Sequence, residues 1–174
     1  MDLSEKRAAV GELYETHFER VARYIAVRIG DIQEAQDLAG EVFLRALRSV
    51  ASYKETGAPL EAWLFKIAHN IAIDHLRKKR RRPASMPLDD TLPVPAADGI
   101  PGEGLEREQE TERLRQAMKQ LSEAQRRVLA LRFGGMMTSE QAARVLGKSP
   151  VSVRVMQSAA VKKLRESLGG SEGK

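Results

Sequence analysis

Residues 138–164 read TSEQAARVLGKSPVSVRVMQSAAVKKL, and they form the most informative local pattern in the chain. A capping box at Thr138 opens a short helix, and Gly147 is the expected residue for a left-handed helix end. Ser149 and Pro150 then open a second helix as its N-cap and its first helical residue. This spacing predicts a helix-turn-helix, whose second helix lies in the major groove of DNA.

The second helix of this motif carries side chains that suit DNA. Arginine can pair bidentately with guanine and glutamine with adenine, while lysine favours phosphate oxygens. The DNA-contacting candidates that we expect on its exposed face are Arg154, Gln157, Ser158 and Lys162. The alternative interpretation is a helical hairpin that only packs or that contacts another protein.

Composition divides the chain into two bodies joined by a linker. Residues 83–104 hold five of the seven prolines and four acidic residues, with no basic residue among them. Proline removes a backbone donor and restricts the residue before it, so helix and sheet are disfavoured there. Residues 1–82 carry 15 basic and 12 acidic side chains, and residues 105–174 carry 14 and 8. We therefore predict two small domains, each with a basic excess, on a flexible linker.

The first body, residues 1–82, is expected to be helical throughout. Apolar residues recur every three or four positions over 8–29, and Gly30 with Asp31 marks one helix end and the next start. A third helix is expected from about Leu60. The apolar positions that we expect to turn inward include Tyr14, Phe18, Leu38, Leu44, Leu47, Trp63 and Ile67. No segment shows the alternation of apolar and polar residues that is typical of strands. The sequence therefore predicts an all-α fold with the helix-turn-helix in its C-terminal domain.

A strip of six consecutive basic residues, 77–82, ends the third expected helix. The same helix carries Asn70 and Asp74, close to a loop that contains Tyr53. Polar side chains beside an aromatic ring and a cationic strip suit a nucleic-acid strand whose bases are unstacked. The alternative is that the strip is only a solvated helix end.

Several classes of function are excluded or disfavoured. The chain has no cysteine, which removes disulfides, thiol catalysis and cysteine-ligated zinc. The three histidines lack metal-ligand spacing, so we expect no metal, no cofactor, no catalytic residue and no enzyme. Apolar runs fall short of the roughly 20 residues that span a bilayer, and the N-terminus lacks a secretion signal. We therefore expect a cytoplasmic protein without membrane insertion.

Taken together, these motifs resemble those of bacterial extracytoplasmic-function (ECF) sigma factors of the sigma-70 family, the RNA polymerase subunits that recognise promoters. The segment EAQDLAGEVFLRAL, residues 34–47, is similar to the helix that docks on the polymerase clamp. The segment WLFKIAHNIAIDHLR, residues 63–77, is similar to the promoter-melting helix. Residues 121–164 resemble the second conserved domain of the family.

The resemblance implies core RNA polymerase and promoter DNA as partners. It implies that residues 1–82 are sigma region 2 and that residues 105–174 are sigma region 4. The residues that would face the polymerase clamp are Asp37, Leu38, Glu41 and Arg45. In the same region, Asn70 and the loop 53–59 would capture an unstacked base of the minus-ten element.

Further DNA contacts are implied in both domains. Asp74, Arg77 and Lys78 would lie along the DNA next to the minus-ten element. The minus-thirty-five element would be read as a duplex by Arg154, Gln157 and Ser158. Many relatives carry His-Arg where this chain has Ser158-Ala159, so the base preference here is expected to differ.

Promoter geometry adds an expectation about the free chain. Two promoter elements about two turns apart lie ~70 Å from each other, whereas a relaxed 22-residue linker spans only ~26 Å. The two bodies should therefore lie close together until polymerase holds them apart.

Two other classes stay open as alternatives. One is a stand-alone helix-turn-helix transcriptional regulator, a hypothesis that does not explain the helix at 63–82. The other is an interaction module such as an anti-sigma or adaptor protein, against which the basic helix ends argue. Family members are commonly held by an anti-sigma protein, so such a regulator is expected as a further partner.

Overall fold

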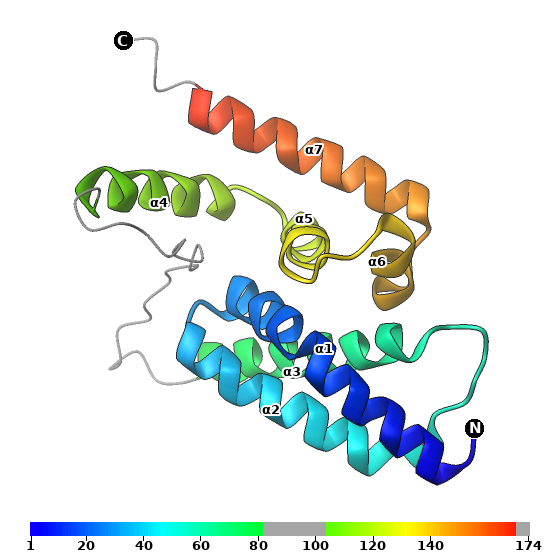
Figure 1. Ribbon diagram of the computed structural model, residues 1–174. Helices are drawn as coiled ribbons and strands as arrows, with labels where there is room; N and C mark the ends of the chain where they lie inside the picture. Colours follow the sequence, from blue (N-terminus) through cyan, green and yellow to red (C-terminus); the bar gives the residue numbers. More distant parts are fainter. Residues whose placement is uncertain (82–103, 170–174) are drawn as a thin grey trace.

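The computed structural model describes residues 1–81 and 104–169, and both of these parts are helical without any strand (Figure 1). The all-α prediction is therefore confirmed. The linker expected at 83–104 lies outside the described residues, apart from Gly104, which begins a helix.

Three helices build the N-terminal body, as expected. Their bounds, with one short 3-10 turn, are α1 Leu3–Ile29, α2 Ile32–Ser49, η1 Val50–Ser52 and α3 Leu60–Arg80. Gly30 ends α1 in the left-handed conformation with φ 101°, which only glycine adopts without strain. Asp31 then caps α2 by accepting a hydrogen bond from the backbone N–H of Glu34 at 3.0 Å.

The C-terminal body contains the predicted helix-turn-helix. Its elements are α4 Gly104–Lys119, α5 Glu123–Leu129, the π-helical turn η2 Ala130–Gly134, α6 Ser139–Leu146 and α7 Pro150–Gly169. Thr138 and Gln141 form the expected capping box, and Gly147 is left-handed with φ 64°. The capping pattern of Ser122 and Gln125 in the sequence predicts a regular helix as far as Phe133, but the chain widens into the π-helical turn at Ala130.

Some apolar side chains expected in the core are exposed. Tyr14 is 46% exposed, Leu44 54% and Leu47 41%. The inward face of α2 is already filled by small and aromatic residues such as Ala39 and Phe43, both buried. A helix that packs on one side buries one stripe, and Leu44 and Leu47 fall outside that stripe. Their exposure corrects the prediction.

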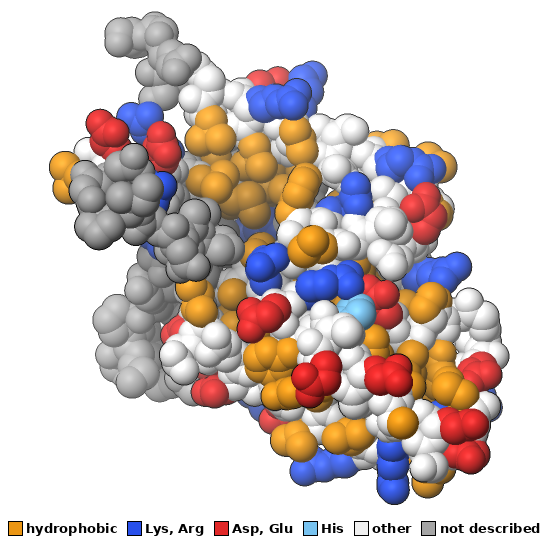
Figure 2. Space-filling model, in the orientation of Figure 1, with side chains coloured by type: hydrophobic (Ala, Val, Ile, Leu, Met, Phe, Trp, Pro, Cys, Tyr) orange, Lys and Arg blue, Asp and Glu red, His pale blue; other side chains and the backbone are white. Residues whose placement is uncertain are grey.

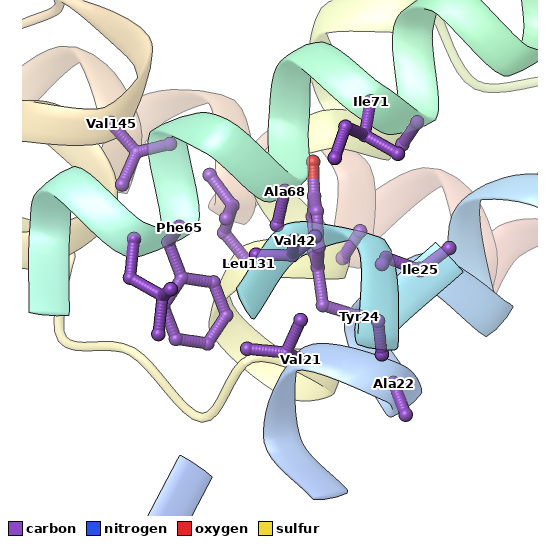
Figure 3. Packing of buried hydrophobic residues seen from close by; sticks show 14 of the residues in the cluster. Val21, Ala22, Tyr24, Ile25, Val42, Phe65, Ala68, Ile71, Leu131 and Val145 are labelled. Atoms are coloured by element: carbon purple, nitrogen blue, oxygen red, sulfur yellow. The ribbon is translucent and has the colours of Figure 1, made fainter. Parts of the chain in front are cut away.

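The two bodies share one hydrophobic core. Helix α1 packs against η2 and helix α3 against α6, so the turn and the first helix of the helix-turn-helix face the N-terminal body. Figure 3 shows Leu131 and Val145 of the C-terminal body among Val21, Tyr24 and Phe65 of the N-terminal body. This agrees with the expectation that the two bodies lie close together.

A glycine pair allows a close approach between the bodies. A Cβ atom added at Gly135 would lie 2.9 Å from the carbonyl oxygen of Leu131 and 3.0 Å from the Phe65 ring. One added at Gly134 would lie 3.2 Å from the Cα atom of Tyr24. A Cβ atom at Gly134 would therefore press on α1, and one at Gly135 would press on α3 and on η2 itself.

Charged side chains also join the bodies. Arg28 of α1 is 3% exposed at its side chain and lies 2.5 Å from the carboxylate of Glu123 in α5. Arg20 donates from Nε to the carbonyl oxygen of Gly135 at 3.0 Å and from Nη2 to Glu61 at 2.8 Å. The buried guanidinium of Arg28 would lose its partner if the bodies separated, so the ion pair favours the docked arrangement.

Candidate nucleic-acid and polymerase interfaces

The outward face of α2 holds the residues expected at the polymerase clamp. Asp37, Glu41 and Arg45 are exposed, and Leu38 is half-buried against the core. Arg45 donates from Nε to Glu41 at 2.9 Å, so these two charges form an exposed pair one helical turn apart.

Exposed leucines widen this face beyond the residues that the sequence indicated. Leu44 lies beside Arg45 in the chain, and Leu47 follows one turn after Leu44, both at the surface. Figure 2 shows acidic side chains over α1 and α2 with hydrophobic ones between them. Helical periodicity alone could not find the two leucines, because their spacing also fits a core stripe.

Helix α3 brings four of the predicted DNA residues onto one face. Asn70, Asp74, Arg77 and Lys78 are all exposed. Their spacing of four, three and one places them along one side of the helix. The opposite side is buried, as at Ala68.

Tyr53 does not lie where the sequence suggested. Its ring is buried, with 8% of the residue exposed, and its centroid lies 5.3 Å from that of Trp63. The Tyr53 hydroxyl donates to the carbonyl oxygen of Ala58 at 2.7 Å, which ties the two ends of the loop together. The loop therefore presents no Tyr53 ring for stacking on a base, and the ring instead holds the loop beside α3.

His69 is a core residue. It is 9% exposed, and its Nδ1 lies 3.0 Å from the hydroxyl of Tyr24. Burial lowers the pKa of His69 to about 4, with further lowering by Arg127 and Arg28. The described residues hold no group of three side chains that could bind a metal ion.

The second helix of the motif, α7, exposes three of its four candidates. Arg154, Ser158 and Lys162 are exposed, whereas Gln157 is half-buried. Gln157 accepts a hydrogen bond at its Oε1 from Nε of Arg132 at 2.8 Å. Because arginine only donates, the amide of Gln157 must turn its oxygen toward Arg132.

The placement of Gln157 differs from the exposed position that the sequence suggested. Gln157 follows Val153 by one helical turn and precedes Ala160, and both of those residues are buried. It therefore lies on the inward stripe of α7, where only its Nε2 donor is free to turn outward. Any DNA contact by Gln157 stays a prediction that rests on this one donor.

Arg154 is held in place by the neighbouring helix. Its Nη1 lies 3.0 Å from Oε1 of Glu140, in the first turn of α6, and both side chains are exposed. A hydrogen bond from its own backbone N–H, followed by the Arg154 contact, lowers the pKa of Glu140. The pair crosses the helix-turn-helix and joins α6 to the arginine that is expected to read a base.

Comparison with known proteins accounts for both bodies. Residues 13–82 match the family model Sigma-70 region 2, and residues 117–166 match Sigma-70, region 4. The chain is 33% identical over 172 residues to the ECF RNA polymerase sigma factor ShbA of Streptomyces griseus, covering 91% of this chain and 90% of ShbA. The chain belongs to the ECF RNA polymerase sigma factors.

Other relatives agree with this assignment, and one solved structure shows a similar fold. SigD of Mycobacterium tuberculosis, an ECF RNA polymerase sigma factor, is 31% identical over 168 residues, which cover 93% of this chain and 78% of SigD. BldN of Streptomyces coelicolor is 31% identical over 156 residues, although the match spans only 59% of BldN. The fold is similar to that of CnrH in its complex with the cytosolic domain of CnrY, with a TM-score of 0.68 and 21% identity over 97% of this chain and 95% of that one.

An ECF sigma factor is a transcription initiation factor that binds core RNA polymerase and promoter DNA. A stand-alone helix-turn-helix regulator is not favoured, because the region 2 match uses the helix that such a regulator leaves unexplained. In the parts of the chain that the structure describes, every helix is too short or too polar to cross a membrane.

Proposed function

We propose that this sigma factor divides promoter recognition between α3 and α7. The observation that carries the proposal is the sorting of exposed polar residues onto one face of each helix. On α3, Asn70 would take an unstacked base of the minus-ten element, and Asp74, Arg77 and Lys78 would follow the adjoining strand. On α7, Arg154 would read a base of the minus-thirty-five duplex and Lys162 would contact phosphate.

The proposed polymerase surface is the outward face of α2. It joins the Asp37, Glu41 and Arg45 charges to the apolar side chains of Leu38 and its exposed neighbours. Mixed surfaces of this kind suit protein partners, since apolar contacts supply affinity and charges supply specificity. This proposal assigns residues 1–82 to region 2 function and residues 105–174 to region 4 function.

Opening of the docked arrangement is part of the proposed mechanism. A compact chain of this length has a radius of gyration of about 16 Å, whereas the two promoter elements lie ~70 Å apart. The docked bodies therefore reach only one element at a time. Binding to polymerase would separate them, since polymerase offers each body its own site.

The proposal includes no catalysis by the chain itself and no cofactor. It places the protein in the cytoplasm, where bacterial RNA polymerase and promoter DNA are found. It also includes an anti-sigma protein as regulator, in line with the common behaviour of the family.

Transcription with purified core polymerase and a promoter library tests the proposal. We expect discrete start sites preceded by two shared sequence elements, and no such start sites without this chain. Tight, sequence-specific duplex binding without polymerase, together with an absence of start sites, would instead support a stand-alone regulator.

A further inference from the structure

The exposed surface of α7 includes two parallel rows with different chemistry. The polar row is formed by Arg154, Ser158 and Lys162, four residues apart and all exposed. The apolar row is formed by Val151, Val155 and Ala159, also four residues apart and all exposed. Residues spaced by four lie one above the other on a helix, so each row follows the helix axis.

The apolar row is not used by the fold. Val151 is 61% exposed and Val155 63%, whereas Val153 on the inward stripe is fully buried. Helix α7 packs on α4, α5 and α6, while η2 and α6 make most of the contacts with the N-terminal body. The valines therefore stay at the surface even in the docked arrangement.

These valines occupy the part of a helix-turn-helix that meets base edges. The recognition helix contacts bases with its N-terminal residues, and Val151 and Val155 lie in the first two turns of α7. In the major groove the 5-methyl group of thymine is the apolar feature that distinguishes the bases, and aliphatic side chains pack on it.

We propose that Val151 and Val155 read thymine methyl groups in the duplex promoter element, with Ala159 extending the same apolar row. This inference rests on the proposed function, because it requires α7 to enter the major groove. Arg154 lies between the two valines and would read a guanine next to the thymines.

The geometry of the helix limits where these thymines can lie. Four residues of helix rise about 6 Å, and one base step rises about 3.4 Å. Val151 and Val155 should therefore contact methyl groups one or two base pairs apart. The upstream element is expected to contain a pair of thymines at this spacing, beside the base that depends on Arg154.

Replacement of thymine by deoxyuridine tests the proposal, because it removes the methyl group and leaves base pairing unchanged. The upstream element is first defined with the reconstituted polymerase, and each of its thymines is then replaced in turn. We expect about fourfold weaker binding at each contacted position, the effect of one buried methyl group. The Val155→Ala variant should bind thymine and deoxyuridine templates equally at its own position.

Lys162→Ala is the matched control, because it changes an exposed residue of the same helix. It should weaken binding to both templates by the same factor and keep the preference for thymine. Circular dichroism of each variant confirms that α7 is intact, as expected for exposed positions.

Three results would overturn the inference, and they differ in whether they also contradict the proposed function. If no deoxyuridine replacement weakens binding while Arg154→Ala still relaxes base preference, the methyl contacts are absent and the proposed function stands. If Val155→Ala weakens polymerase binding but keeps the thymine preference, the apolar row faces a protein. If no promoter-specific start sites exist, both the inference and the proposed function fail.

Discussion

Individual side chains carry the proposed division between duplex and melted DNA. Arg154 and Asn70 are both exposed, but they lie on different bodies of the molecule. We expect Arg154→Ala to weaken binding to duplex upstream DNA by about 1–3 kcal/mol and to relax base preference there. Transcription from a template with a preformed bubble should change little, as measured by binding and transcription assays on both templates.

Asn70→Ala should have the opposite effect, since the amide is proposed to act only on an extruded base. Binding to the closed duplex should stay nearly intact, opening should be impaired, and a bubble template should partly restore transcription. Glu140→Gln is a useful control for Arg154, because it removes the ion pair and keeps the arginine. Equal loss of the same step in both alanine variants would contradict the division.

His69 makes stability depend on pH. Its folded-state pKa is lowered from 6.5 to about 4, so the unfolded chain binds a proton at a higher pH than the folded chain. The contribution of neutral His69 is complete above pH 6.5 and is lost as the pH falls toward 4. The free energy of unfolding should fall by up to about 1.4 kcal/mol per pH unit in this window.

Urea unfolding at several pH values, with His69→Gln for comparison, measures this effect. Glutamine can still accept a hydrogen bond from Tyr24 but does not titrate, so the slope between pH 6.5 and 4 should decrease. An unchanged slope would show that another group is responsible. Glu123 affects stability at lower pH. Burial raises the pKa of its carboxyl, but Arg28 holds that pKa below the ordinary value. The stability that ionised Glu123 contributes is therefore lost under more acidic conditions.

At the scale of the helix, the outward face of α2 can be tested without disturbing the core. Asp37→Lys with Glu41→Lys changes two exposed residues, so the free energy of unfolding should change by about 0.5 kcal/mol or less per site. The reversed charge should nevertheless abolish co-purification with core polymerase and transcription.

The matched control reverses the same amount of charge on α1. Glu12 and Glu15 are also exposed helical residues, and their double replacement by lysine gives the same net charge. We expect this control to bind polymerase normally. Normal co-purification of the α2 variant would remove this face from the polymerase interface.

For the whole molecule, the docking of the two bodies is the feature that a single methyl group can disturb. Gly135→Ala would place a Cβ atom 2.9 Å from the Leu131 carbonyl oxygen of η2 and 3.0 Å from the Phe65 ring of α3, so it should strain η2 and weaken its docking on α3. Solution scattering should show a larger radius of gyration, and limited proteolysis between Arg82 and Leu105 should become faster. Because opening is part of the proposed mechanism, promoter-specific transcription should be retained.

Two further variants separate docking from local strain. Gly40→Ala adds the same methyl group where no atom lies within 4 Å, so it should leave the radius unchanged. Arg28→Ala removes the ion pair with Glu123 without touching η2, so it should also favour the separated form. A radius unchanged by both Gly135→Ala and Arg28→Ala would contradict the proposed role of this interface.

The elements of this protein were predictable from the sequence because their signals are local. Asp31, Thr138 and Gly147 act through hydrogen bonds and backbone angles within about four residues, so the helix starts and the helix-turn-helix could be read directly. The same holds for the exposed face of α3, where spacing alone brings Asn70 and Asp74 together.

The residues that differed from expectation depend on which groups pack around them in the folded chain. Tyr53 is buried because Trp63 and Ala58 lie against it, and Gln157 is turned inward because Arg132 reaches it from η2. Leu44 is exposed because other residues of α2 already fill the shared core. Periodicity shows that a helix has an apolar stripe, but which side chains are covered depends on how the helices and loops pack in the tertiary structure.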